Sequence, residues 1–296
     1  MADQPSGVPP VALLGAGIMG GGMGRSILRA GLPLRAWNRT VSRAKALEPD
    51  GAQIALSPAE AVADAQVIVT MLADADAVTE AMTAAAPALQ DGQIWAQVST
   101  VGLAGLERLA GFASDHGLVL VDSPVLGTRQ PAEQGALTVF AAGPDAARTT
   151  VQPVFDAIGS KTVWLGQEPG AASRLKLVVN SWVLALTSGA AEAVALAQGL
   201  DLDPGLFLDA VSGGPLDCPY LHTKAGAIIN DDFSPSFSAE MAGKDARLIV
   251  EAAGQAGIRM DVAAAVAERL RRTVDFGHGS QDMSATYFAS FDGARR

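Results

Sequence analysis

The sequence has very few of the side chains that bind metals or form covalent cross-links. It contains one cysteine, Cys218, and three histidines that are scattered along 296 residues. One cysteine excludes an internal disulfide framework and a cysteine-based zinc site, and the histidines lack metal-ligand spacing. We therefore expect no bound metal and a reducing compartment, the cytoplasm.

Positive charge and targeting segments are also scarce. The chain has 21 Lys and Arg against 31 Asp and Glu, a formal net charge of -10. A nucleic-acid surface needs clustered basic residues, so we expect no nucleic-acid partner. Residues 1–10 have neither the basic nor the apolar part of a signal peptide, and no stretch of about 20 residues lacks polar groups. We expect a disordered leader over 1–10 and no membrane partner.

Apolar residues, in contrast, are plentiful, and their spacing predicts the fold. They make up 49% of the chain, enough for two domains with buried cores. The expected strands are Val11 to Leu14, Pro33 to Trp37, Val67 to Leu72, Ile94 to Gln97, Val119 to Asp122 and Leu137 to Ala141. A helix from about Met19 to Ala30 follows the first strand, and Ala-rich helical segments separate most of the others. This order predicts right-handed crossovers and a doubly wound parallel sheet, the Rossmann α/β fold.

The pattern changes near Gly166, where the alternation of strands and helices stops. From Ala171 to Gln198 the sequence is typical of one long apolar helix, and the rest of the chain is helical with loops. We expect a dinucleotide-binding domain over 11–168 and an all-helical domain for substrate and dimerisation over 169–296, joined by the long helix. Such a helix must pack in its own domain or against another subunit. Residues 289–296 are expected to be loose.

A glycine-rich turn follows the first strand directly. Gly15-Ala16-Gly17-Ile18-Met19-Gly20 has the spacing G-x-G-x-x-G and opens a helix. The first glycine permits the tight turn, the second lets the backbone approach a pyrophosphate, and the third lets helix and strand pack closely. The turn therefore predicts a dinucleotide site.

The end of the second strand distinguishes NADP from NAD. An NAD site places an acidic residue about 20 positions after the glycines, but this strand ends in Asn38-Arg39-Thr40. Arg39 can offer a permanently charged fork to a 2′-phosphate, with Asn38 and Thr40 as neutral donors. We predict NADP, with NAD possible; alternatively, Arg39 is a solvated loop cation.

Polar residues form a stripe on the long helix. Lys176 and Asn180 are four residues apart and share a face, with Ser173 and Thr187 close to the same stripe. Hydride arriving at a carbonyl carbon leaves charge on oxygen, which a placed ammonium can stabilise and protonate. The stripe thus fits a substrate cleft, but a lysine extending to a domain surface has the same spacing.

Taken together and in this order, these features resemble the β-hydroxyacid dehydrogenase family, within the 6-phosphogluconate dehydrogenase superfamily. That family includes 3-hydroxyisobutyrate dehydrogenase, tartronate semialdehyde reductase and glyoxylate/succinic semialdehyde reductases. The likeness runs from about Val11 to Phe288 and includes Met23 after the glycines. The resemblance implies that Lys176 is the general acid/base and that Asn180 holds the substrate. It also implies dimers or tetramers.

Further cofactor contacts come from the resemblance alone. Lys244-Asp245 matches a pair that faces the cofactor and the site in the family. Met71-Leu72 and Ser99-Thr100 match loops that contact the cofactor in the family, although each could be an ordinary strand end.

The substrate loop departs from the family pattern. Asp-x-Pro-Val-Ser-Gly-Gly is usual, whereas this chain has Asp122-Ser123-Pro124-Val125-Leu126-Gly127-Thr128. Leu126 removes a hydroxyl and adds apolar bulk, so Ser123, Gly127 and Thr128 are the expected substrate contacts, and Arg129 can help or remain a surface residue. A larger or less acidic substrate than 3-hydroxyisobutyrate is therefore expected.

The sequence thus favours an NADP-dependent oxidoreductase that acts on a small semialdehyde and hydroxy-acid pair. Two alternatives stay open at this point. Imine reductases are similar in fold and in the Asn-Arg-Thr motif, although they typically replace the lysine with Asp or Tyr. A non-catalytic NADP-binding protein would be expected to lose Lys176, which this chain keeps.

Overall fold

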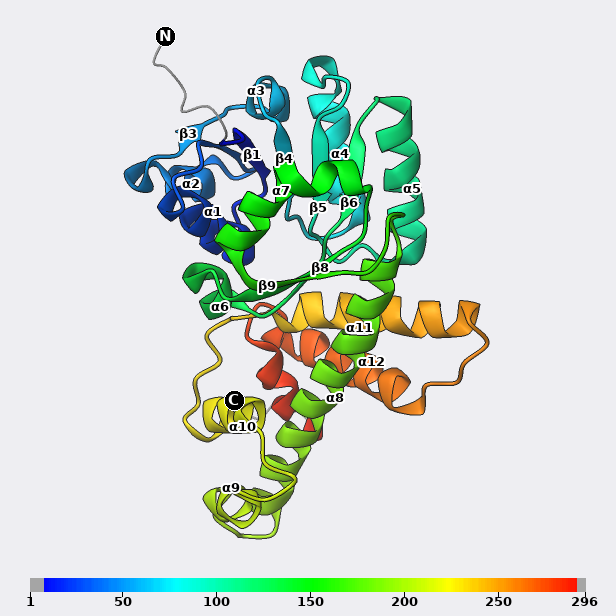
Figure 1. The fold of residues 1–296 in the computed structure, drawn as a ribbon. Helices are drawn as coiled ribbons and strands as arrows, with labels where there is room; N and C mark the ends of the chain where they lie inside the picture. The colour runs from blue at the N-terminus through cyan, green and yellow to red at the C-terminus, as the bar shows by residue number, and fades with distance from the viewer. Residues whose placement is uncertain (1–7, 292–296) are drawn as a thin grey trace. The chain divides into compact units, whose positions relative to one another are not determined.

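The computed structural model describes residues 8–291, which form two compact units that meet in the sequence between Lys176 and Leu177. Figure 1 shows the ribbon, with an α/β first unit and a helical second unit. The sequence predicted the boundary between the two domains near residue 168. In the structure, the first unit also includes the start of the long helix α8 (Ala171–Gly199).

Six parallel strands form the main sheet of the first unit, in the order β3-β2-β1-β4-β5-β6. The strands are β1 (Val11–Leu14), β2 (Leu34–Trp37), β3 (Gln53–Ile54), β4 (Val67–Thr70), β5 (Ile94–Gln97) and β6 (Val119–Asp122). Strand order reverses between β1 and β4, which are neighbours at the centre of the sheet. The predicted doubly wound sheet is confirmed, and its ligand-binding crevice is expected where β1 and β4 end.

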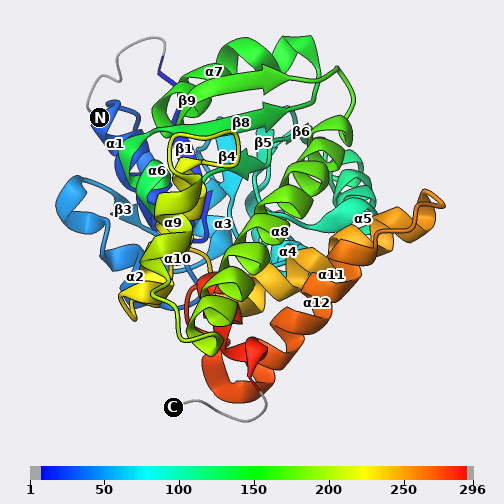
Figure 2. The ribbon, with the colours of Figure 1, turned by 90° about the horizontal axis from the view of Figure 1, so that it is seen from below.

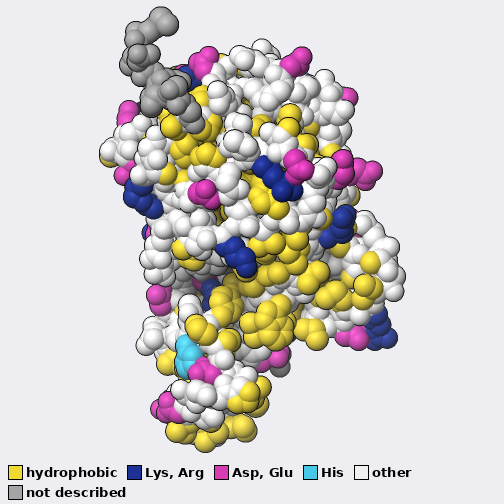
Figure 3. Space-filling model, viewed as in Figure 1, with side chains coloured by type: hydrophobic (Ala, Val, Ile, Leu, Met, Phe, Trp, Pro, Cys, Tyr) yellow, Lys and Arg dark blue, Asp and Glu magenta, His cyan; other side chains and the backbone are white. Residues whose placement is uncertain are grey.

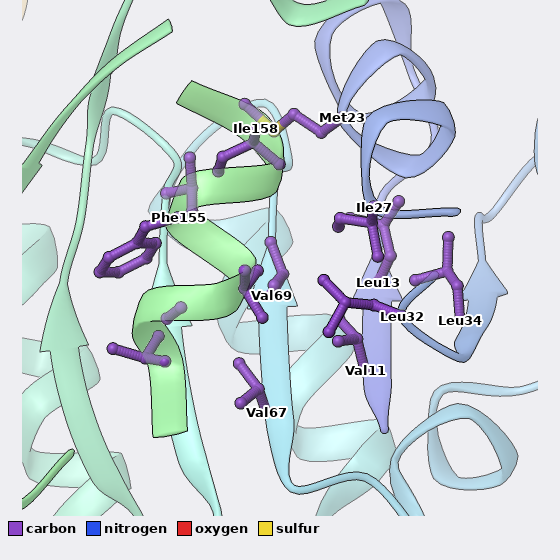
Figure 4. Close-up of a cluster of buried hydrophobic side chains, with 14 of the residues drawn as sticks. Val11, Leu13, Met23, Ile27, Leu32, Leu34, Val67, Val69, Phe155 and Ile158 are labelled. Carbon is purple, nitrogen blue, oxygen red and sulfur yellow. The ribbon is translucent and has the colours of Figure 1, made fainter. Parts of the chain in front are cut away.

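Alternate residues of each strand face opposite layers of helices. Leu13 packs toward α1 (Ile18–Arg29) and α7 (Asp145–Ile158), as Figure 4 shows. Leu14 packs on the other face, against α3 (Pro58–Val62), α4 (Ala75–Ala85) and α5 (Gly102–Asp115). A strand buried on both faces is a continuous apolar run, which is why the sequence pattern located these strands.

A smaller sheet in the first unit corrects one prediction. The run 137–141 was expected in the main sheet, but β8 (Leu137–Ala141) pairs antiparallel with β7 (Val125–Leu126) and parallel with β9 (Gly159–Trp164). A single bridge from Asp122 to Ala142 connects β6 with the end of β8. Strands β3 and β7 are too short, and β9 too exposed, to give an apolar signal.

The remaining helices complete each unit. The first unit also contains α2 (Val41–Lys45), α6 (Arg129–Gln134) and the 3₁₀ turns η1 (Glu48–Asp50) and η2 (Ala86–Ala88). The second unit continues from α8 with α9 (Gly205–Val211), α10 (Pro219–Ile229), α11 (Ala239–Gln255), α12 (Asp261–Thr273), the π turn η3 (Val274–His278) and the 3₁₀ segment η4 (Met283–Ser290). Figure 2 shows α11 and α12 side by side. The predicted helical C-terminal part is confirmed.

Helix α8 is long and apolar enough to cross a bilayer by length and composition. In its most apolar window, 44% of the residues are buried within the protein. Two of its buried side chains, Ala191 and Val194, pack with Ala225 and Ile228 of α10. Part of the apolar surface is thus core, as expected for a helix that packs in its own domain.

The described residues nearest to each end of the chain are packed. Val8 packs against the core, and the carbonyl of Pro10 accepts hydrogen bonds from Gln66 and Val67, so residues 8–10 are not a loose leader. At the other end Ala289 is buried within η4. The rest of the predicted leader (1–7) and most of the predicted loose tail (292–296) lie outside the described residues.

Candidate cofactor and active site

The glycine turn has the shape that a bound pyrophosphate requires. Gly15 has a φ of +109°, and a Cβ added there would lie 2.2 Å from the carbonyl oxygen of Met71. A Cβ at Gly20 would lie 1.9 Å from the carbonyl oxygen of Gly15. A Cβ at Gly17, in contrast, would meet no protein atom within 4 Å. Two glycines thus permit close packing and the third leaves open space, as the sequence predicted for a backbone that approaches a phosphate.

The start of α1 suits an anion electrostatically. The helix begins at Ile18, directly after Gly17, and its first turn has no acidic residue. The N–H groups of the first turn have no partner within a helix, and the helix dipole favours negative charge there. Ile18 is exposed at this position, and Met19 packs against the core beside it. The described residues therefore fit the diphosphate of a dinucleotide.

The Asn38-Arg39-Thr40 segment divides into a structural and an exposed part. Asn38 is buried; its Oδ1 accepts from the Ala16 N–H at 3.0 Å, and its Nδ2 donates to the Thr40 carbonyl at 3.0 Å. Asn38 therefore holds the glycine turn against the end of β2, and its contact with cofactor stays a prediction. Arg39 and Thr40 are exposed and available to a phosphate.

A buried hydrogen-bond network fixes the loops after β4 and β5. The Ser99 Oγ accepts from the Leu72 N–H at 2.9 Å, and the Gln97 Oε1 accepts from the Ser99 N–H at 2.9 Å. This network holds Leu72 close to the glycine turn, since a Cβ at Gly15 would lie 2.9 Å from Leu72 Cδ2. Thr100, next to Ser99, is partly exposed. The structure therefore brings the Met71-Leu72 loop to the predicted cofactor site.

In the substrate loop, the side chain of Ser123 is hydrogen-bonded to the main chain, and its contact with substrate stays a prediction. Ser123 was expected to bind substrate, but it is fully buried, and its hydroxyl donates to the carbonyls of Gln97 and Val121 at 3.3 and 3.2 Å. Its side chain therefore faces the sheet, because the chain continues from β6 with the alternation of a strand. Arg129 pairs with Glu133 at 3.0 Å on the surface, so its charge is already partly neutralised.

The next residues of this loop remain candidates for the substrate. Gly127 has a φ of +128°, and a Cβ there would lie 2.6 Å from Leu137 Cδ2, so only glycine fits. Thr128 precedes α6 and is partly exposed. Leu126 is half-buried in β7, where it pairs with Thr138. The loop thus presents a backbone turn, one hydroxyl and one apolar side chain.

The polar stripe on α8 is buried rather than extended to solvent. Lys176 is only 9% exposed, and Ser173, Asn180 and Thr187 are also buried. A lysine that extends to a domain surface would keep its ammonium in water, so this placement favours the catalytic interpretation. Buried polar groups need partners, and Ser173, Asn180 and Thr187 have theirs within the protein.

Within the second unit, Asp245 orients the side chain of Asn180. The family motif had paired Asp245 only with its neighbour Lys244. Asp245 is buried, and its Oδ2 accepts from Asn180 Nδ2 at 2.6 Å while its Oδ1 lies 3.0 Å from Lys244 Nζ. The carboxylate fixes which way the Asn180 amide points and directs its oxygen away from Asp245. Sequence spacing could not reveal this contact, because 65 residues separate Asn180 from Asp245.

Comparison with known proteins agrees with this geometry. Residues 10–166 match the NAD-binding domain of 6-phosphogluconate dehydrogenase. Residues 170–289 match the family described as NAD-binding of NADP-dependent 3-hydroxyisobutyrate dehydrogenase. The chain is similar to glyoxylate/succinic semialdehyde reductases 1 and 2 of Arabidopsis thaliana, at 30% identity in both cases. The matches cover 93% and 94% of this chain, and 96% and 78% of those proteins.

Solved structures show the same fold. A 3-hydroxyisobutyrate dehydrogenase from Salmonella typhimurium is similar with a TM-score of 0.87 and 26% identity, over 94% of this chain and 98% of that one. An imine reductase from Pseudomonas sp. has a TM-score of 0.63 at 20% identity, over 96% of this chain and 100% of that one, which is a likeness of fold alone. The chain belongs to the β-hydroxyacid dehydrogenase family and is an NAD(P)-dependent oxidoreductase that acts on hydroxyl groups.

Proposed function

We propose that this protein is an NADPH-dependent reductase of a small semialdehyde, with Lys176 as the general acid that protonates the product hydroxyl. The burial of Lys176 on the polar face of α8 carries this proposal. The semialdehyde class is supported by the two plant relatives, which are named for glyoxylate and succinic semialdehyde.

Lys176 and Asn180 of the stripe each have a chemical task in this reaction. With NADPH bound, its nicotinamide would supply the hydride. As the carbonyl carbon accepts it, the carbonyl oxygen gains negative charge, and the Lys176 ammonium stabilises that charge and donates a proton to the oxygen. The amide of Asn180, held by Asp245, binds the same oxygen or a neighbouring hydroxyl. In the oxidative direction, a neutral Lys176 amine accepts the proton from the hydroxyl.

We propose that NADP is preferred over NAD. Arg39 and Thr40 are exposed where the adenosine ribose is expected, and the strand end has no carboxylate for a ribose hydroxyl. A guanidinium binds a phosphate through two parallel hydrogen bonds, which favours the 2′-phosphate of NADP.

The substrate class follows from the loop after β6. Leu126 brings apolar bulk in place of a hydroxyl, so the carboxylate of a substrate would bind to the Gly127 backbone and to Thr128. We propose a substrate with a longer apolar part than 3-hydroxyisobutyrate. Leu126 also supports cyclic imines as the second candidate class, because an imine has no carboxylate to bind.

A panel of substrates with NADPH tests the proposal. We expect oxidation of NADPH with succinic semialdehyde or a longer semialdehyde, faster than with glyoxylate and faster than with cyclic imines. If only imines were turned over, the reaction would be C=N reduction and the proposed reduction of a semialdehyde would be wrong. No turnover of any aldehyde or imine in the panel would contradict both.

We also propose a homo-oligomer, a dimer or tetramer, in the cytoplasm. In the second unit, Val178, Trp182 and Leu196 of α8 are exposed, and no residue of α9 is buried. Figure 3 shows hydrophobic side chains at the surface around α9. Apolar patches of this kind mark interaction surfaces, and a second copy of the chain would cover them.

A further inference from the structure

A buried carboxylate joins the main sheet to the start of the helix that carries Lys176. Asp122 is the last residue of β6, and its side chain is completely inaccessible. Its Oδ2 accepts hydrogen bonds from the backbone N–H groups of Gly170 and Ser173, both at 2.9 Å. Its Oδ1 accepts a bond from Ser173 Oγ at 2.7 Å. One carboxylate thus receives three donors from the beginning of α8.

These bonds replace a local helix cap with one from a distant part of the chain. The first N–H groups of an α-helix have no partner within the helix, and a nearby Ser, Thr, Asp or Asn usually accepts one of them. Gly170, which precedes α8, has no side chain to do so and has a φ of +119°. Asp122 supplies the acceptor across 48 residues. Its negative charge also complements the positive end of the helix dipole.

Asp122 itself is held from both sides. Its N–H donates to the Ala142 carbonyl and its carbonyl accepts from the Ala142 N–H, both at 2.9 Å, so its backbone is fixed between the two sheets. Burial raises the pKa of Asp122, while the bonds from Ser173 and Gly170 and the charge of Arg174 lower it in part. A buried carboxylate is costly compared with an apolar residue, so its presence calls for a specific role.

We propose that Asp122 is a positioning residue for Lys176. By capping α8, Asp122 fixes the rotation and height of the helix, and with them the point at which Lys176 presents its ammonium. Ser173 and Lys176 are three residues apart on one face, separated by about 4.5 Å along the axis. Asp122 also begins the substrate loop, so it sets the distance between that loop and the proton donor. The inference rests on the proposed role of Lys176.

A double-mutant cycle in the full-length protein tests this role. Asp122→Asn keeps the shape of the side chain but replaces one carboxylate oxygen with an NH2 group. This group donates hydrogen bonds, so it would face the donors of Gly170 and Ser173 with no acceptor between them. We expect kcat to fall about 10- to 100-fold, while the Kd for NADPH changes less than about threefold. In a Lys176→Ala background the same change should lower kcat no further, because the group that it positions is gone.

Two results would overturn the inference: an unchanged kcat for Asp122→Asn, or an equal fall in kcat with and without Lys176. The proposed function fails separately, if Lys176→Ala alone retains full activity. The cycle therefore distinguishes a wrong role for Asp122 from a wrong role for Lys176.

A milder pair of variants covers the case in which Asp122→Asn does not fold. Ser173→Ala removes one of the three donors to Asp122. Ser26→Ala is the matched control, because Ser26 is also buried and its hydroxyl donates to the Ala132 carbonyl at 2.9 Å. Both should lower Tm similarly, but only Ser173→Ala should lower kcat, by about three- to tenfold. An equal kcat in the two variants would overturn the inference.

Discussion

In the proposed function, Arg39 is the residue on which the preference for NADP over NAD depends most. It is exposed directly after Asn38, which holds the glycine turn. We predict that Arg39→Ala lowers kcat/KM for NADPH by at least about tenfold and leaves that for NADH nearly unchanged, because only NADPH has the 2′-phosphate. Steady-state kinetics with both cofactors measures this. Arg108→Ala, which removes an exposed cation paired with Asp76, is the control. An equal loss for both cofactors would show that Arg39 does not bind the 2′-phosphate.

A second buried carboxylate, Asp282, forms an ion pair with a buried lysine of the second unit. Its Oδ1 lies 2.7 Å from Lys224 Nζ, and both side chains are buried. Burial raises the pKa of Asp282, but the Lys224 ammonium and the Ser236 hydroxyl outweigh it and lower the pKa to about 2. A lowered pKa means that the folded state binds the proton more weakly than the unfolded state. The contribution to stability is therefore present above the unfolded value of 3.8 and is lost as pH falls toward 2.

The lowered pKa of Asp282 predicts how the stability of Asp282→Asn, measured by urea unfolding, depends on pH. The variant should be less stable than the wild type at pH 6, and the difference should narrow by about 1 kcal/mol at pH 3, where part of the wild-type contribution is lost. Free energies of unfolding of both proteins at the two pH values measure the change. A difference that does not depend on pH would contradict the assigned ionisation.

At the scale of elements, the turn between β1 and α1 separates packing from binding. A Cβ at Gly20 meets a backbone oxygen, whereas a Cβ at Gly17 meets no protein atom. We predict that Gly20→Ala lowers the free energy of unfolding by about 1–3 kcal/mol, the usual range for overpacking. Gly17→Ala should change stability little and should weaken NADPH binding at least about tenfold, because the methyl group lies where the pyrophosphate approaches. The Kd for NADPH and the free energy of unfolding are measured for both variants. The prediction is contradicted if Gly17→Ala mainly lowers stability and Gly20→Ala mainly weakens binding.

The strands show which features of the fold can be predicted from the sequence and which cannot. The expected ranges for β1, β5, β6 and β8 match the structure, because strands buried on both faces are continuous apolar runs. The membership of β8 in the smaller sheet was missed, since pairing is a long-range property that apolar pattern does not encode. β9 was missed because Ser160 and Lys161 are exposed.

Some features of the candidate site could likewise be predicted from the sequence, and others could not. Local motifs located the glycine turn and the buried face with Lys176, because both are defined within one or two turns of chain. The bonds from the Ser123 hydroxyl to backbone carbonyls were not predicted, since burial of a hydroxyl against such carbonyls gives no sequence signal. The contacts from Asp122 to Ser173 and from Asp245 to Asn180 span 51 and 65 residues, and only the folded chain reveals them.

At the scale of the whole molecule, the proposed homo-oligomer would use the apolar surface of the second unit. Trp182 is 65% exposed on α8, as is Val178 one turn before it, and a second copy of the chain would cover this apolar surface. We predict that Trp182→Glu dissociates the oligomer, and sedimentation velocity measures the mass. Leu56→Glu is the control, because Leu56 is 72% exposed but lies outside α8 and α9. A wild-type protein that sediments as a monomer would contradict the proposed assembly.

The role of Lys176 is the central claim, and the turnover of Lys176→Ala tests it most directly. With the best substrate of the panel, we predict that kcat falls by about 10² or more, the range for a lost general acid. The Kd for NADPH should stay within about threefold of the wild-type value, because the glycine turn and Arg39 are unchanged. A variant that binds NADPH normally and keeps nearly full kcat would contradict the account.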